Sequence, residues 1–130
     1  SVLIMDDEEV ILEMLAEMLS LMGLTAKHTP DGDSAVQAFK TAQESDTPFC
    51  AVILDLTIPG GMGGKETARI IRDLDADIPI FVASGYSEDA AIARPADFGF
   101  TASLEKPFSH SELVKMFQTH VPSSINPDIS

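Results

Sequence analysis

Along the whole chain, short runs of consecutive apolar residues alternate with longer segments in which apolar residues recur at helical spacing. Residues 2–5, 49–54 and 78–83 are almost wholly apolar, which is typical of strands that are buried on both faces of a sheet. Two weaker runs, over residues 24–28 and 100–104, are also predicted to be strands. The pattern therefore predicts a sheet built from all of these segments.

Helical spacing fills the intervals between the predicted strands. Apolar side chains recur at helical positions from Ile11 to Met22, and Gly23 then ends that helix. Ser109 and Glu112 form a capping-box pattern at the start of the last helix. The predicted helices are the segment that ends before Gly23, residues 33–42, 65–74 and 87–94, and the segment that follows Ser109.

This alternation of strands and helices predicts an α/β fold. Parallel strands need right-handed crossovers, and the helices of those crossovers cover both faces of the sheet. A length of 130 residues fits one domain. We place that domain at residues 1–121 and expect residues 122–130, which lack a helical or strand pattern, to form a flexible C-terminal tail.

Polar and charged residues follow four of the predicted strands at the point where each strand ends. Asp6 and Asp7 follow the first strand, Asp55 the third, Ser84 the fourth and Lys106 the fifth. The carboxyl ends of parallel strands meet at one edge of a sheet, where ligands bind in such folds. We therefore expect these five residues to converge on one site.

The chemistry of this set points to phosphoryl transfer. Clustered carboxylates repel one another unless a cation neutralises them, and oxygen ligands without His or Cys favour Mg²⁺. A carboxylate can also attack phosphorus, and Asp55, on the central strand, is the candidate nucleophile. Ser84 and Lys106 would then stabilise the transferred group, while Asp6 and Asp7 hold the metal. Taken singly, each residue also fits a structural role, such as a helix cap or a surface lysine.

Charge and composition narrow the possible partners. The formal net charge is −13, from 21 acidic and 8 basic residues, so the surface repels nucleic acid and anionic membranes. Cys50 is the single cysteine, and its apolar surroundings predict a buried, inert thiol. No segment has the length of a membrane span and no signal peptide is visible, so we expect a cytoplasmic location. The start at Ser1, without an initiator Met, predicts a piece of a longer protein.

At the residues around this set, the sequence resembles the receiver domain of two-component response regulators. The matching motifs stand in the family's order: Met5-Asp6-Asp7-Glu8, Ile53-Leu54-Asp55-Leu56, Ile58-Pro59-Gly60, Ala83-Ser84-Gly85 and Glu105-Lys106-Pro107-Phe108. The resemblance implies a flavodoxin-like, doubly wound, five-stranded parallel sheet in the order 2-1-3-4-5 with five helices. It covers the chain from about Val2 to His120.

The same resemblance implies a role for each site residue. Asp55 would be the phosphoacceptor and a ligand of Mg²⁺, Asp7 a direct metal ligand and Asp6 a ligand acting through water, with the carbonyl of Thr57 as a further ligand. By the same resemblance, Ser84 would be the switch hydroxyl and Lys106 the cation that contacts the phosphoryl oxygens.

The resemblance also implies a partner and an activity. The phosphoryl donor would be a histidine kinase or a histidine phosphotransfer domain, and the domain would be a regulatory phosphoacceptor rather than a turnover enzyme. The runs from Thr57 to Glu66 and from Ala83 to Ser87 resemble receivers of hybrid sensor histidine kinases. The sequence leaves the oligomeric state open.

Two alternative functions stay open beside this one. A Mg²⁺-dependent phosphatase with an aspartyl-phosphate intermediate would need a second Asp two residues after the nucleophile, where this chain has Thr57. A silent receiver-like interaction module is the other alternative. It is kept open by Ser103, which stands where receivers commonly place a switch aromatic, with Phe100 and Tyr86 as the nearby aromatic residues.

Overall fold

The five strands form one parallel sheet in a computed structural model that describes residues 1–85 and 89–122. The sheet order is β2-β1-β3-β4-β5. The strands are β1 (Val2–Met5), β2 (Ala26–Thr29), β3 (Ala51–Asp55), β4 (Ile80–Ser84) and β5 (Ala102–Glu105). The helices are α1 (Glu9–Leu21), α2 (Gly32–Gln43), α3 (Gly64–Leu74), α4 (Ala90–Ala93), the 3₁₀ helix η1 (Pro95–Phe98) and α5 (His110–His120). The predicted doubly wound order is therefore confirmed.

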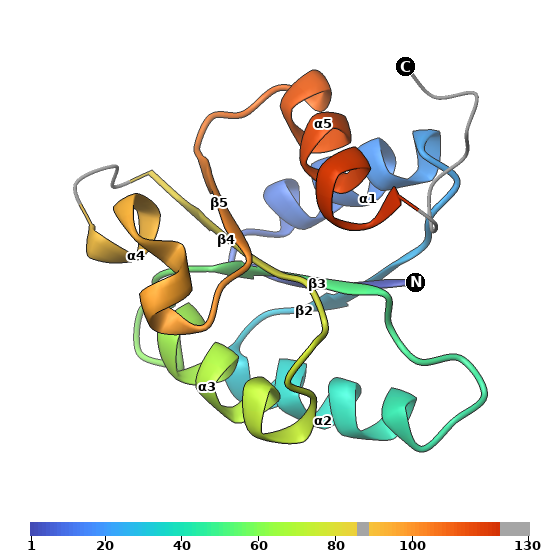
Figure 1. The fold of residues 1–130 in the computed structure, drawn as a ribbon, viewed down its shortest axis with the longest axis vertical. Coiled ribbons are helices and arrows are strands. Elements are labelled where there is room, and N and C mark those ends of the chain that lie inside the picture. The colour runs from blue at the N-terminus through green and yellow to red at the C-terminus, as the bar shows by residue number, and fades with distance from the viewer. Residues whose placement is uncertain (86–88, 123–130) are drawn as a thin grey trace.

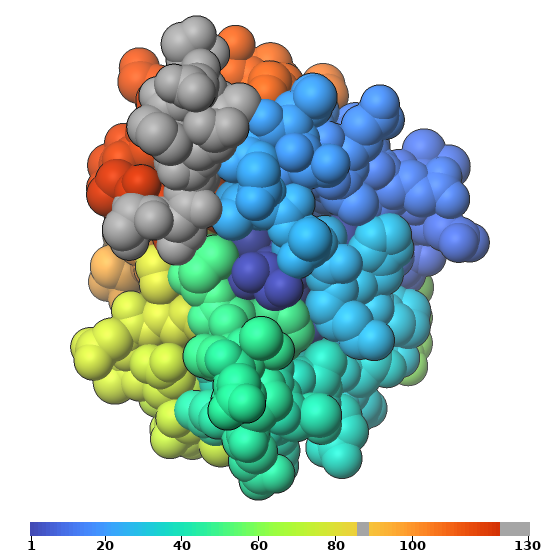
Figure 2. Space-filling model, turned by 90° about the vertical axis from the view of Figure 1, so that its right-hand side faces the viewer, coloured from blue at the N-terminus to red at the C-terminus, as the bar shows by residue number. Residues whose placement is uncertain are grey.

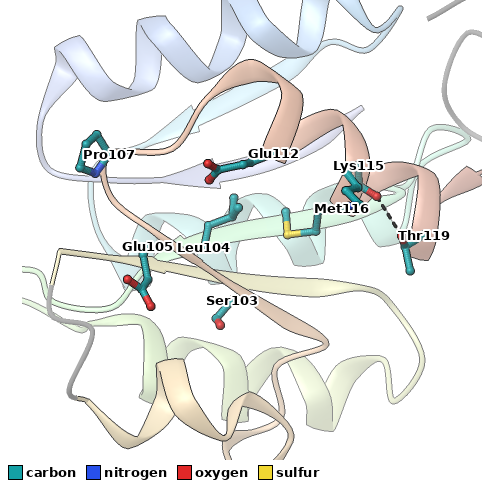
Figure 3. Close-up of a pocket in the computed structure, with 8 residues that line it drawn as sticks. All are labelled: Ser103, Leu104, Glu105, Pro107, Glu112, Lys115, Met116 and Thr119. Carbon is teal, nitrogen blue, oxygen red and sulfur yellow. Dashed lines mark hydrogen bonds between the residues drawn. The ribbon is translucent and has the colours of Figure 1, made fainter. Parts of the chain in front are cut away.

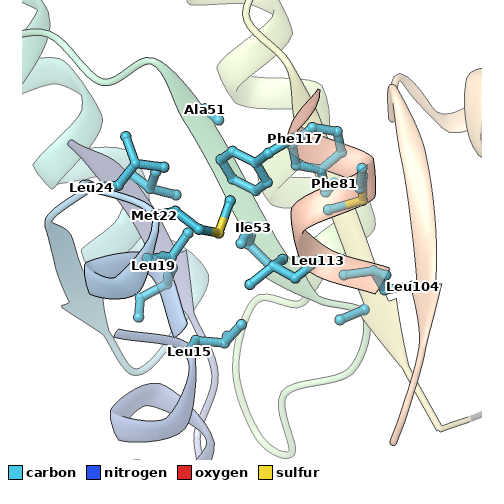
Figure 4. Close-up of a cluster of buried hydrophobic side chains, with 14 of the residues drawn as sticks. Leu15, Leu19, Met22, Leu24, Ala51, Ile53, Phe81, Leu104, Leu113 and Phe117 are labelled. Carbon is cyan, nitrogen blue, oxygen red and sulfur yellow. The ribbon is translucent and has the colours of Figure 1, made fainter. Parts of the chain in front are cut away.

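Helices cover both faces of the sheet, with α1 and α5 on one face and α2 and α3 on the other (Figure 1). Alternate residues of each strand point to opposite faces. Ile53 packs into the core beneath α1 and α5, whereas its neighbours Val52 and Leu54 pack into the core beneath α2 and α3. Figure 4 shows the first of these cores, in which Phe81 and Phe117 have ring centroids 5.3 Å apart. Burial on both faces explains why the central strands are continuously apolar.

The predicted helix ends at Gly23 and Ser109 are confirmed. Gly23 adopts a φ of 83°, and the amide of Leu24 donates to the carbonyl of Leu19, which closes α1. Because Leu24 belongs to this helix end, β2 begins at Ala26 and not at the predicted residue 24. At α5, the hydroxyl oxygen of Ser109 accepts a hydrogen bond from the Glu112 amide at 3.1 Å.

The fourth helix is shorter than the predicted segment 87–94, of which residues 87 and 88 lie outside the described part. α4 begins after its N-cap Asp89 and ends at Ala93, because Pro95 disfavours a helical conformation at the residue before it. The chain then turns through η1, and the amide of Phe100 donates to the carbonyl of Pro95. Phe100 is thus part of this turn, so β5 begins at Ala102 instead of residue 100.

The amino ends of the strands lie on one side of the molecule, opposite to the carboxyl ends (Figure 1). Figure 2 shows the side with the amino ends, where the dark-blue start of the chain lies between light-blue and green segments. Cys50 lies near the chain start, since its thiol donates to the Ser1 carbonyl at 3.3 Å. The prediction of a buried thiol is wrong, because Cys50 is only half-buried at the edge of the core. Within the described residues, no helix is long and apolar enough to cross a membrane. Apart from Pro122, the predicted tail lies outside the described residues.

Candidate functional site

The carboxyl ends of β1, β3, β4 and β5 bring the predicted site residues together. β3 ends at Asp55 and β4 at Ser84, while Lys106 directly follows β5. The amide of Lys106 donates to the carbonyl of Ser84 at 2.8 Å, which fixes these two positions relative to each other. A pocket of about 450 Å³ opens here, lined by Asp7, Glu8, Asp55, Thr57, Pro59, Ser84, Gly85 and Lys106.

The ammonium group of Lys106 joins two carboxylates. Its Nζ lies 2.8 Å from Oδ2 of Asp6 and 3.3 Å from Oδ1 of Asp55. The other oxygen of Asp6 accepts a hydrogen bond from the Glu8 amide at 2.9 Å. Asp6 is only 2% exposed, so its burial depends on these partners. Asp6 therefore links the end of β1 to the cation of the site.

Burial, more than the charges of its neighbours, sets the pKa of Asp55. Burial raises the pKa of its carboxyl most, the charge of Lys106 opposes this, and the charges of Asp6 and Asp7 raise it again, to about 6. For Lys106, burial alone would lower the pKa, but the hydrogen bond to Asp6 and the charges of Asp55 and Asp6 outweigh burial and raise it. The lysine is thus a fixed cation in a site with a surplus of carboxylates.

This surplus is the chemical environment that a hard cation would relieve. Carboxylate oxygens of Asp6, Asp7 and Glu8 lie within 4.8 Å of one another, and Asp55 lines the same pocket. Oxygen donors without nitrogen or sulfur suit Mg²⁺, which usually takes only one or two carboxylates. The residues present therefore fit the predicted metal. Glu8, which stands in the first motif but not among the predicted ligands, adds a third carboxylate to this group.

Two glycines allow the segment after Asp55 to fold back closely. A Cβ atom at Gly64 would lie 2.6 Å from the carbonyl oxygen of Asp55, and one at Gly63 would lie 2.7 Å from that of Leu56. The amide of Gly64 donates to the carbonyl of Leu56 at 3.0 Å. The loop between β3 and α3, which contains Thr57, is thus anchored at the pocket by contacts that only glycine permits.

A family model described as the response regulator receiver domain matches residues 2–118. The chain belongs to this family. The parallel sheet in the order β2-β1-β3-β4-β5 is the architecture that the resemblance implied. The five strand-end residues stand together at the carboxyl edge of this sheet, four of them lining the pocket and Asp6 bound to Lys106.

Curated relatives extend the comparison. The transcriptional regulatory protein YvrH of Bacillus subtilis is 31% identical over 121 residues, which is 93% of this chain and 48% of that protein. The alkaline phosphatase synthesis transcriptional regulatory protein SphR of Synechococcus elongatus is 30% identical, over 87% of this chain and 45% of that protein. The receiver domain thus spans about half the length of these relatives.

Solved structures of similar chains share the fold. A CheY-like receiver domain from Methanospirillum hungatei JF-1 matches with a TM-score of 0.81 at 18% identity, covering 95% of this chain and 94% of that one. A chain of the CheX–CheY–BeF3–Mg²⁺ complex from Borrelia burgdorferi matches with a TM-score of 0.81 at 22% identity, covering 91% and 86%. Because both identities are low, these two comparisons show that the fold is shared and no more.

Ser103 is the position at which this receiver domain departs from the expected motif set. It lines a hollow of about 550 Å³ between β5 and α5 (Figure 3). Its hydroxyl donates to the carbonyl of Ile92 at 2.9 Å, so the side chain binds the backbone of α4. Phe100 is 2% exposed and packs into the core beneath α2 and α3, while Tyr86 lies outside the described residues. At the position where the resemblance leads us to expect an aromatic ring, the chain thus has a serine whose hydroxyl is bonded to α4.

Proposed function

We propose that this receiver domain is a cytoplasmic phosphoacceptor that takes a phosphoryl group onto Asp55 in the presence of Mg²⁺ and changes its surface in response. The observation that carries the proposal is the position of Lys106, whose Nζ contacts both Asp6 and Asp55 at the pocket that Ser84 lines. One cation, one candidate nucleophile and one hydroxyl thus meet where three strands end. This is the set of groups that phosphoryl transfer requires.

The transfer step follows from the chemistry of a phosphohistidine donor. A carboxylate oxygen of Asp55 attacks phosphorus, an O–P bond forms, and the N–P bond of the donor breaks. The electron pair of the broken bond returns to the imidazole nitrogen, which then takes a proton from water. Asp55 must be ionised to attack, and its pKa of about 6 leaves most of it ionised near neutral pH.

The other residues act on the charge of the transferred group. Lys106 can turn from the carboxylate of Asp55 to a phosphoryl oxygen while its backbone stays bound to Ser84. The hydroxyl of Ser84 would donate to a second phosphoryl oxygen. Asp7, Asp55 and the carbonyl of Thr57 would hold Mg²⁺, with Asp6 acting through water. When bound, the ion supplies positive charge to the phosphoryl oxygens.

The donor that we propose is a histidine kinase or a histidine phosphotransfer domain, and the comparisons support this at the level of the family. A chain of similar fold was solved in a complex that contains BeF3 and Mg²⁺, which supports the metal and a phosphoryl-like ligand in this pocket. We also propose that the domain belongs to a hybrid sensor histidine kinase, on the motif evidence of the segment that begins at Thr57. Thr57 further argues against phosphatase turnover, because it offers no carboxylate for acid–base catalysis.

Mass spectrometry of the intact protein tests the proposal. The domain is incubated with MgCl₂ and phosphoramidate, a donor with an N–P bond, beside the variants Asp55→Ala and Asp46→Ala. Asp46 is an exposed acid in the loop that leads into the amino end of β3, on the side of the sheet opposite to the carboxyl ends that form the site. We expect one labile phosphoryl group on the wild type and on Asp46→Ala, and none on Asp55→Ala.

Other results would reject the proposal. A phosphoryl group that persists on Asp55→Ala would assign the wrong acceptor. An unlabelled wild type, with no change in its amide spectrum on addition of BeF3 and Mg²⁺, would favour the silent module. Sustained hydrolysis of a phosphate ester by the wild type would favour the phosphatase.

A further inference from the structure

Five polar or charged side chains are buried in the described part of the chain, and their positions are not random. Asp6, Asp55 and Ser84 belong to the strand-end site. The other two are Thr29 and Thr67, which are 3% and 0% exposed. Neither of these threonines lines the pocket, so their burial needs a different explanation.

Thr67 is explained by its own helix. Its hydroxyl donates to the carbonyl of Gly63, four residues earlier, at 2.7 Å. This is the local bond that threonine commonly makes at the start of a helix or inside one. The Thr67 hydroxyl also lies 3.8 Å from Sδ of Met5 in β1. Thr29 differs, because among the described residues its hydroxyl has no partner in its own element and binds the backbone of the neighbouring strand, at Ile4.

Thr29 holds β1 through its hydroxyl and its carbonyl. It ends β2 and lies opposite Met5 in the register of the two strands. Its hydroxyl donates to the carbonyl of Ile4 at 2.7 Å, and its own carbonyl accepts from the amide of Asp6 at 3.1 Å. Thr29 therefore binds β1 on both sides of Met5, at Ile4 and at Asp6, the first of the acidic residues.

The end of β1 needs this restraint because both carboxylate oxygens of Asp6 must meet a partner. One carboxylate oxygen accepts from the Glu8 amide and the other accepts from Lys106. Burying the hydroxyl of Thr29 would cost free energy without its bond, and valine would fill the same space without that cost. Packing alone therefore does not explain a threonine here.

We infer that Thr29 is a positioning residue, which fixes the carboxyl end of β1 so that Asp6 and Asp7 hold Lys106 and a divalent cation. The part of this inference that concerns the cation rests on the proposed function. Thr29 itself does not touch the reacting groups. It acts through the backbone of Ile4 and Asp6.

Magnesium titration of the domain, followed by amide NMR, tests this role with three variants. Thr29→Val removes the hydroxyl and keeps the shape, whereas Thr29→Ser keeps the hydroxyl. Thr101→Val is the stability control, because the hydroxyl of Thr101 accepts from the Ile80 amide at 3.0 Å at the opposite end of the sheet. We expect Thr29→Val to weaken Mg²⁺ binding about tenfold, and Thr29→Ser and Thr101→Val to bind as the wild type does.

A second measurement needs no metal. Hydrogen exchange at the amides of Asp6 and Glu8 should be faster in Thr29→Val than in the wild type or in Thr101→Val. Equal Mg²⁺ affinity in Thr29→Val and the wild type, or an equal loss in Thr101→Val, would overturn the inference. If the wild type binds no Mg²⁺, the proposed function fails, and unchanged exchange at Asp6 would then overturn the role of Thr29 as well.

Discussion

Lys106 lies closer to Asp6 than to the candidate nucleophile: its Nζ is 2.8 Å from Oδ2 of Asp6 and 3.3 Å from Oδ1 of Asp55. Asp6 is also the more deeply buried of the two carboxylates, at 2% exposure against 9%. In the proposed transfer, the lysine is thus held by a residue that does not itself react. Asp55 keeps the weaker contact, which a phosphoryl oxygen can replace.

Replacing Lys106 by methionine should raise the pKa of Asp55 above about 6, because the charge of Lys106 is the main influence that lowers it. The substitution also leaves Asp6 buried without its ion-pair partner, which should destabilise the domain by about 3 kcal/mol near neutral pH. Carboxyl NMR titration measures the pKa, and thermal unfolding measures the stability. Lys115→Met, at an exposed position of α5, is the control. An unchanged pKa of Asp55 would contradict the ion pair.

Asp55 should make the metal-free domain less stable as pH rises. Its pKa is about 6 in the folded state against 3.8 for the ordinary group, so the folded state binds the proton more tightly. The stabilisation from this proton is complete below the unfolded value and is lost as pH rises through about 6. The difference between the two pKa values corresponds to a change in the free energy of unfolding on the order of 3 kcal/mol.

The variant Asp55→Asn removes this titration and isolates its effect. Without metal, the variant should unfold at a higher temperature than the wild type at about pH 8, and the difference should shrink towards about pH 4. Adding MgCl₂ should raise the unfolding temperature of the wild type more than that of the variant, because the ion binds the folded state. A wild type that is as stable as Asp55→Asn at both pH values would contradict the raised pKa.

The strand-end residues were predictable because a parallel sheet leaves little freedom there. Once the strands of Asp55 and Ser84 are known to be parallel and adjacent, their carboxyl ends must meet at one edge. The partner of Lys106 was not predictable in the same way. Its closer approach to Asp6 depends on side-chain placement to within half an ångström, which hydrophobic patterning does not determine.

The sequence predicts the boundaries of β2, β5 and α4 less accurately, because local hydrogen bonds and a proline determine where these elements begin and end. The boundaries near Leu24 and Phe100 moved because hydrogen bonds of the preceding turns use the amides of these residues. α4 is short because Pro95 interrupts it. Thr29 gave no signal in the sequence, since its two bonds to β1 are visible only when β2 is paired with β1.

Gly64→Ala should destabilise the domain by about 2 kcal/mol, because the new Cβ would lie 2.6 Å from the carbonyl oxygen of Asp55. The contact is with backbone, so a side-chain rotation cannot relieve it. Thermal unfolding measures the loss, and phosphoryl uptake should also slow as the loop with Thr57 shifts. For stability, Gly85→Ala is the matched control, since nothing lies within 4 Å of a Cβ at that position. Equal stability of the two variants would show that the loop adapts freely.

Ser103→Ala should loosen α4 while the rest of the domain stays intact. The substitution removes the hydrogen bond from the Ser103 hydroxyl to the carbonyl of Ile92, a loss of about 1 kcal/mol. Amide exchange should therefore speed up at Ile92 and Arg94, whose amides bond to the carbonyls of Asp89 and Ala90 within α4. Exchange in α1 and α5 should not change.

Thr119→Ala is the matched control for this prediction, because it removes another hydroxyl–carbonyl bond, to Lys115 at 2.9 Å, from the exposed side of α5. If Ser103 also transmits the phosphorylation signal, the BeF3-induced amide shifts in α4 should be smaller in Ser103→Ala than in Thr119→Ala. Shifts of equal size in both variants would show that α4 responds to the pocket without Ser103. The hydrogen bond to Ile92 would then hold α4 in place without relaying the state of Asp55.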